Sequence, residues 1–166
     1  SQYNRLIRLN ITVDEAWAQI EVQLKRRADL IPNLVETVKG YMTHESGTLE
    51  KVTAMRARAQ NASSSDERFQ AESQISSLLG NIMAVSENYP DLKASTNFTN
   101  LQTELSGIEE QIQLSRRYYN GTVRDLNIMI DQFPTNIIAG MGGFTKKEFF
   151  EIENEADREV QKVSFN

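Results

Sequence analysis

The chain has 166 residues, of which 39% are hydrophobic and 25% charged, and it carries a formal net charge of −5 with no cysteine. This length suits one domain with a buried core, so we expect residues 1–166 to form a single domain. The acidic balance argues against a nucleic-acid partner, because phosphate binding requires a basic face, and the lack of cysteine excludes disulfides, thiolate metal sites and cysteine nucleophiles.

Residues 13–42 predict one long amphipathic helix. Its apolar positions recur every three or four residues, at Val13, Trp17, Ile20, Leu24, Ala28, Ile31, Val35, Val38 and Met42. The stripe extends through Leu49, Val52, Met55 and Ala59. Gly40 and Gly47 weaken the middle of this extension, each by about 1 kcal/mol relative to alanine.

Pro32 lies inside this stripe, in the stretch RRADLIPNLVETVKGY at residues 26–41. The stripe keeps its phase across the proline, which favours one kinked helix. In that helix the carbonyl of Ala28 loses its intrahelical partner and is met by water or a neighbouring side chain. The alternative is a new helix capped by Asn33, with Glu36 completing a capping box.

Two further long helices are predicted. Ser64 with Glu67 forms a capping box that opens the second, which ends before Pro90. The third spans residues 98–133, where apolar or aromatic side chains recur every three or four positions, and it ends at Pro134.

The C-terminal region is predicted to contain a loop, a short helix and an extended tail. The glycine-rich TNIIAGMGGF, residues 135–144, is interpreted as the loop. Thr145 with Glu148 is a second capping box that opens the helix KKEFFEI, and REVQKVSFN, residues 158–166, is expected to be extended.

These elements predict an all-α fold. We expect an elongated, antiparallel, up-and-down bundle of three long helices plus a short C-terminal helix, similar to a four-helix bundle. At 1.5 Å per residue the first and third helices are about 50–70 Å long. No apolar stretch approaches the roughly 20 residues that a membrane-spanning helix needs.

Catalytic and metal-binding patterns are weak. His44 is the sole histidine, so the Glu-x-x-His pair of di-iron bundles is absent, and we expect this side chain to be exposed or simply hydrogen-bonded. GMGGF lacks the context of a phosphate-binding loop. The carboxylate pairs are interpreted as solvated charge, as are the basic clusters at 25–27, 116–117 and 146–147. These carboxylate pairs are Asp14-Glu15, Glu109-Glu110 and Glu153/Glu155.

Two features remain as candidates for binding. The first is an apolar C-terminal set, which we interpret as a cap on the end of the bundle, with a ligand surface as the alternative: Ile137, Ile138, Met141, Phe144, Phe149 and Phe150. The second is a polar set on the long helices: Gln19, Asn33, Tyr119, Asn120 and Asn127. For these we expect inter-helical hydrogen bonds that fix register, with a binding groove as the alternative.

Residues 16–45, AWAQIEVQLKRRADLIPNLVETVKGYMTHE, resemble the most recognisable signature of the LemA family. The resemblance continues in NFTNLQTELSGIEEQIQLSRRYYNGTVRDLNIMIDQFPTNIIAGMGGF and in the ending FFEIENEADREVQKVSF. These segments cover most of the chain in the family's order. Residues 60–90 match least, and Gln161 stands where the family usually has a proline.

The resemblance implies a bacterial protein with an antiparallel helical bundle. LemA-like proteins normally carry one N-terminal membrane helix that ends just before the Tyr-Asn found here as Tyr3-Asn4, so we expect a membrane helix that this chain lacks. The resemblance carries no catalytic residue, metal ligand or cofactor. It leaves open which side of the membrane the bundle faces.

We therefore expect a non-enzymatic, membrane-anchored interaction or scaffold protein. It would lie at the bacterial inner membrane as a single-pass protein, with the bundle outside the bilayer and other membrane or envelope proteins as partners. The alternatives are a protein that binds a small ligand or a metal through inter-helical polar residues, and an enzyme that uses carboxylates with His44.

Overall fold

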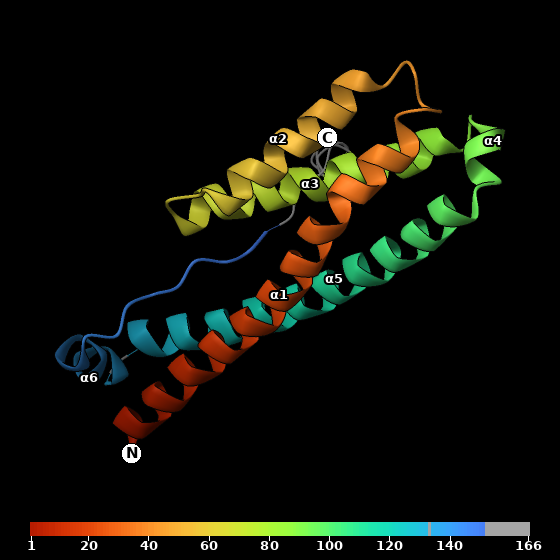
Figure 1. The fold of residues 1–166 in the computed structure, drawn as a ribbon. Coiled ribbons are helices and arrows are strands. Elements are labelled where there is room, and N and C mark those ends of the chain that lie inside the picture. Colours follow the sequence, from red (N-terminus) through yellow and green to blue (C-terminus); the bar gives the residue numbers. More distant parts are fainter. Residues whose placement is uncertain (133, 152–166) are drawn as a thin grey trace, which may run out of the picture. The chain divides into compact units, whose positions relative to one another are not determined.

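The computed structural model describes residues 1–132 and 134–151 (Figure 1). Within these residues the chain forms six helices and no strand, so the predicted all-α fold is confirmed. The helices are α1 (Gln2–Val38), α2 (Ser46–Gln60), α3 (Ser65–Ser86), α4 (Pro90–Lys93), α5 (Thr96–Asp131) and α6 (Thr135–Gly142). The tail predicted to be extended, residues 158–166, lies outside the described residues.

The chain divides into two compact units, and α1 and α5 each contribute to both. Unit 1 contains Ser1–Gln23 and Glu110–Phe150, and unit 2 contains Leu24–Glu109. In unit 2, Arg27 of α1 bonds to Glu109 of α5, whereas Thr37, further along α1, bonds to the earlier residue Asn97 (3.2 Å). The two helices therefore run antiparallel there, as predicted.

The core of unit 2 is built from all five helices that enter it. α2 packs against α3, and the apolar faces of α1, α4 and α5 join them. Its buried members are Ile31, Leu34, Val38, Met42, Leu49, Val52, Ala59, Ala71, Ile75, Leu79, Ile82, Leu92, Phe98 and Leu105. Most of the stripe predicted for residues 13–59 is therefore buried, as its spacing requires.

The prediction that the apolar stripe continues along the first helix to Ala59 is wrong. α1 ends at Val38, and the chain turns before α2 begins at Ser46. Gly40 lies in this turn, where the backbone entropy of glycine disfavours a helix. The turn is also tied to the far end of α3, since the hydroxyl of Tyr89 donates to the carboxylate of Glu45 (2.6 Å). Reversal of the chain lets Leu49 and Val52 reach the core.

Pro32 lies inside a continuous α1, so the alternative of a new helix capped by Asn33 is wrong. The proline has no N–H to give to the carbonyl of Ala28. Arg56 of α2 supplies the missing donor, because its Nε donates to that oxygen at 2.7 Å. The expected partner for the freed carbonyl is therefore confirmed as a side chain from a neighbouring helix.

The C-terminal prediction reverses the positions of helix and loop. Residues 135–142 form α6, which ends at Gly143 in the left-handed conformation (φ 73°), where glycine meets no Cβ penalty. The predicted helix KKEFFEI is non-helical over its described residues, 146–151. Figure 1 shows the chain after α6 as a stretched, uncoiled path, so this segment is extended. The predicted cap of the second helix is confirmed, because the Ser64 hydroxyl accepts from the N–H of Glu67 (3.1 Å). The helix also ends before Pro90, as predicted, and Pro90 itself opens the one-turn helix α4.

The role of Arg56 predicts a coupling with Pro32. Replacement Arg56→Met removes the donor from a half-buried carbonyl and lowers the free energy of unfolding by about 1–3 kcal/mol. In a Pro32→Ala chain, residue 32 regains its N–H, so the same replacement costs at least about 0.5 kcal/mol less. Chemical denaturation of the two single variants and the double variant measures this coupling. Arg58→Met, at an exposed position on α2, is the control, and additive effects of Arg56→Met and Pro32→Ala would contradict the assignment.

Candidate functional site

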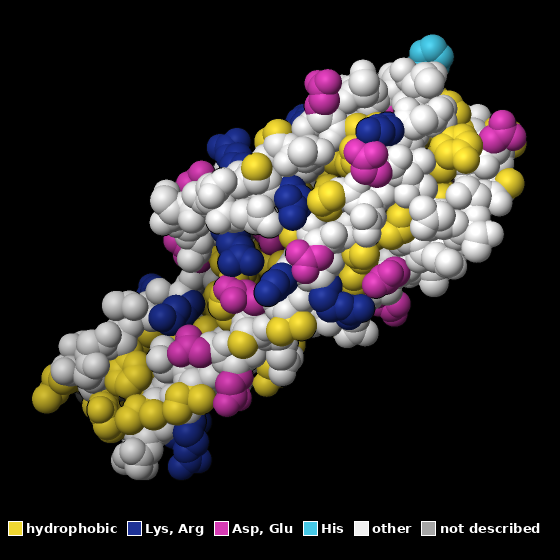
Figure 2. Space-filling model, in the orientation of Figure 1, with side chains coloured by type: hydrophobic (Ala, Val, Ile, Leu, Met, Phe, Trp, Pro, Cys, Tyr) yellow, Lys and Arg dark blue, Asp and Glu magenta, His cyan; other side chains and the backbone are white. Residues whose placement is uncertain are grey.

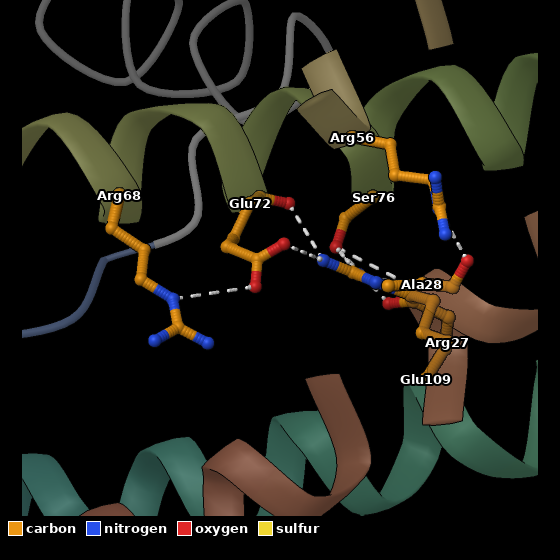
Figure 3. Close-up of polar contacts among 7 residues, drawn as sticks. All are labelled: Arg27, Ala28, Arg56, Arg68, Glu72, Ser76 and Glu109. Carbon is orange, nitrogen blue, oxygen red and sulfur yellow. Dashed lines mark hydrogen bonds and ion pairs between the residues drawn. The ribbon is translucent and has the colours of Figure 1, made fainter. Parts of the chain in front are cut away.

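Arg27 of α1 is the largest fully buried side chain in the described part of the molecule, at 1% exposure. Its guanidinium faces α3 and α5 (Figure 3). Nη1 donates to the Ser76 hydroxyl (2.6 Å) and to the Glu109 carboxylate, and Nη2 donates to the carbonyl (3.0 Å) and carboxylate (3.4 Å) of Glu72. One cation therefore links three helices of unit 2.

The positions of these residues follow from helical spacing. Arg27 lies three residues after Leu24 and four before Ile31, so it shares their buried face. Glu72 and Ser76 are four apart on α3 and therefore project from adjacent turns toward the same point. Ser76 also donates to Glu109 (3.1 Å), which joins the acceptors to one another.

The interpretation of these charges as solvated is wrong for Arg27 and Glu109. Glu72 and Ser76 were not predicted at all. A signal for the buried ion pair was present in the sequence: Arg27 interrupts the apolar series Leu24–Ile31, and Glu72 interrupts the series Phe69–Ile75. Opposite charges on the buried faces of two helices indicate a pair, because a lone buried charge is too costly.

Burial raises the pKa of Glu72 above its ordinary value of 4.5. The guanidiniums of Arg27 and Arg68 oppose this shift, the latter through an ion pair with 3.9 Å between Nε and the carboxylate. Desolvation is the larger effect on the pKa of Glu72, because its carboxylate is only 5% exposed. Arg27 lowers the pKa by a smaller amount, because it divides its hydrogen bonds among several acceptors. The net direction is upward, so the folded protein binds the proton of Glu72 more tightly than the unfolded chain does.

The raised pKa of Glu72 predicts a pH-dependent stability. The stabilising contribution of this group is fully present below its unfolded-state pKa of 4.5 and is lost as the pH rises through the higher folded-state value. The difference in unfolding free energy between the wild type and Glu72→Gln should therefore fall as the pH rises from about 4 to about 7. Denaturant titrations across this range measure it, with Glu104→Gln on the exposed face of α5 as control. A difference that rises with pH would contradict the direction of the shift.

A second polar arrangement, in unit 1, holds residues 147–150 against α5. The side-chain amide of Asn120 donates to the carbonyl of Phe150 (2.7 Å) and accepts from its N–H (2.8 Å). Asn127 bonds in the same way to both backbone groups of Lys147, at 3.0 and 2.9 Å. The Tyr119 hydroxyl donates to the carbonyl of Glu148 (3.0 Å). We name this arrangement the asparagine clamp: Tyr119, Asn120 and Asn127 with the backbone of residues 147–150.

Aromatic rings complete the asparagine clamp. Phe150 is fully buried, and its ring lies 6.1 Å from that of Trp17, which lies 5.6 Å from that of Tyr119. Burial raises the pKa of the Tyr119 hydroxyl, as do the nearby carboxylates of Glu148 and Asp14, so Tyr119 stays protonated and available as a donor.

The polar residues predicted to join the long helices therefore fall into two groups, one that makes structural hydrogen bonds and one that is exposed. Tyr119, Asn120 and Asn127 do form structural hydrogen bonds, but the prediction of a helical partner is wrong, because they bond to the backbone of an extended segment. This segment is non-helical for the same reason, since its N–H and C=O groups pair with asparagine instead of with its own turns. Gln19 and Asn33 are exposed.

The remaining carboxylate and histidine candidates are exposed where the structure describes them. His44 is exposed, as expected, and so are Asp14, Glu15 and Glu110. Glu153 and Glu155 lie outside the described residues. In residues 1–132 and 134–151 no group of three or more acidic or histidine side chains is arranged to hold a metal ion.

The apolar C-terminal set is only partly the predicted cap. Phe150 is buried and Phe144 is half-buried, with its ring 5.9 Å from that of Tyr3. Gly142 allows this close approach, because a Cβ there would lie 2.7 Å from the ring of Phe144. Ile137, Met141 and Phe149 are exposed by 55%, 84% and 43%.

The fold and its polar contacts define an all-α helical bundle in which a buried arginine joins three helices of unit 2 and two asparagines of α5 hold a non-helical segment in unit 1. Among known families, the model of the LemA family matches residues 16–165. This chain belongs to the LemA family.

Curated relatives share moderate identity with the chain. Protein LemA of Metamycoplasma hominis is 32% identical over 82% of this chain, and the chain spans 63% of the length of that relative. Magnetosome protein MamQ 2 of Paramagnetospirillum magneticum is 24% identical over 96% of this chain and 68% of the relative. Magnetosome protein MamQ of Magnetospirillum gryphiswaldense is 22% identical over 90% of this chain and 64% of the relative.

Proposed function

We propose that this protein is a non-enzymatic, membrane-anchored helical module that serves as a scaffold for other membrane or envelope proteins of a bacterial cell. The observation that carries the proposal is the exposed apolar end of unit 1. There α6, with the sequence TNIIAGMG, has no charged side chain and leaves Ile137 and Met141 exposed. No helix among the described residues is long and apolar enough to cross a membrane. In this proposal the exposed apolar end of unit 1 rests on the lipid surface.

The first turns of α1 lie at the same end of unit 1. Tyr3 is 49% exposed and its ring contacts that of Phe144, just beyond α6. Arg5 and Arg8, two exposed cations, follow on α1. Figure 2 shows hydrophobic side chains gathered at this end of the unit, with basic side chains beside them. An apolar patch beside arginines is the composition of surfaces that lie on anionic lipid headgroups.

This proposal predicts vesicle binding that depends on α6. The chain should float with vesicles of phosphatidylcholine and phosphatidylglycerol, and the double replacement Ile137→Ser and Met141→Ser should weaken this binding at least about tenfold, because two apolar side chains no longer enter the interface. Leu114→Ser, which changes a leucine of α5 that is 49% exposed, close to the 55% of Ile137, is the control.

In cells, the full-length protein fused to a proximity-labelling enzyme should mark a reproducible set of membrane or envelope proteins. Equal flotation of the α6 variant and the wild type would contradict the proposed lipid-facing end. A labelled set no different from that of an untargeted enzyme would contradict the scaffold role.

A further inference from the structure

In the asparagine clamp, the distance between the two asparagines along α5 is close to the distance between the two residues that they bind in the extended segment. Asn120 and Asn127 are seven residues apart, which is about 10.5 Å along α5 at 1.5 Å per residue. Lys147 and Phe150 are three residues apart, which is about 10 Å in an extended chain. Each asparagine therefore meets both polar groups of one residue, as a neighbouring strand would.

The hydrogen bonds of the asparagine clamp recognise backbone groups of the bound segment and not its side chains. The two asparagines donate two hydrogen bonds and accept two, and Tyr119 donates one. All five are made with peptide groups that every non-proline residue carries. The side chains of Glu148 and Phe149 are exposed. Lys147 is half-buried, and Phe150 is the one buried side chain of residues 147–150, against Trp17. The main sequence requirement of the clamp is therefore one aromatic side chain.

We propose that Trp17, Tyr119, Asn120 and Asn127 form a binding site for an extended peptide with an aromatic anchor. Residues 147–150 of the same chain fill the site in an isolated molecule, and the same segment of a second copy fills it when copies exchange. Backbone pairing at a fixed spacing is the chemistry by which proteins add a peptide strand with little dependence on its sequence.

The contacts of the asparagine clamp favour a second copy of this chain as the partner that supplies the segment. Every copy carries both the clamp and a segment that satisfies it, so exchange restores each hydrogen bond and ring contact without new complementarity. The segment is joined to α6 through Gly143, the half-buried Phe144 and the exposed residues Thr145 and Lys146. The N–H of Phe144 donates to the carbonyl of Ala139 (3.0 Å) and its ring contacts that of Tyr3, so the hinge for exchange lies at Thr145 and Lys146. An ion pair between Lys146 and Asp131 (2.7 Å) ties this hinge to α5, and it contributes little because both side chains are exposed. The inference is independent of the proposed membrane role, because that role rests on Tyr3, Arg5, Arg8, Ile137 and Met141, and none of these residues belongs to the asparagine clamp.

Trp17 is the single tryptophan of the chain and reports directly on the site. In full-length Phe150→Ala protein, loss of the buried ring should shift Trp17 emission to the red. A synthetic peptide of residues 144–151 should reverse that shift with saturable, one-to-one binding. Asn120→Ala or Asn127→Ala in the same protein should weaken peptide binding at least tenfold, whereas Gln111→Ala, at an exposed position on α5, should leave it unchanged.

A peptide with alanine at the position of Phe150 is the ligand control and should not bind. Circular dichroism establishes that each variant stays helical, and Phe150→Leu replaces Phe150→Ala if the latter unfolds. Absence of peptide binding to helical protein, or binding that Asn120→Ala does not affect, would overturn the site.

Exchange between copies is measured by mixing wild-type protein labelled with a donor or an acceptor near residue 149. Energy transfer that grows with concentration and is lost in Asn120→Ala supports the second copy as the occupant. Peptide binding without any energy transfer at the highest soluble concentration would overturn that occupant while leaving the site.

Discussion

The guanidinium of Arg27 is the constraint on which the rest of unit 2 depends. A fully buried cation is stable only if each N–H that faces the interior has an acceptor, so the partners on α3 and α5 must be correctly placed along their helices. Apolar packing tolerates small displacements between helices. Hydrogen bonds at 2.6–3.0 Å to Ser76 and to the Glu72 carbonyl tolerate far less, and they therefore select one register among the several that the apolar stripes allow.

The same requirement explains two other features of the chain. Pro32 leaves a carbonyl of α1 without its donor, and Arg56 from α2 provides one. In unit 1, residues 147–150 make no helix, and Asn120 and Asn127 pair with their backbone. In each place a side chain from another element does what the local backbone cannot. The role at a membrane is a proposal, and it is supported by the family relationship and by the exposed apolar end of unit 1.

The helical fold follows from the sequence because periodicity reports burial directly: the apolar positions of α1, α3 and α5 recur every three or four residues over many turns. The errors arise where local signals compete with distant contacts. The box Thr145–Glu148 is a real capping pattern, but the backbone of that segment bonds to α5, 20 to 30 residues earlier in the chain. Arg27 is a basic residue like its exposed neighbours Lys25 and Arg26, and only its helical spacing from Leu24 places it on the buried face.

The most direct test of the central claim is a double-mutant cycle on Arg27 and Glu72. Arg27→Met alone leaves buried acceptors without their cation and should cost about 3–5 kcal/mol of unfolding free energy. Glu72→Gln relieves part of that cost, so the pair should couple by about 2–3 kcal/mol. Lys25→Ala, at an exposed position on the same turn, should change stability by less than about 0.5 kcal/mol. Effects of Arg27→Met and Glu72→Gln that add to within about 0.5 kcal/mol would contradict the account.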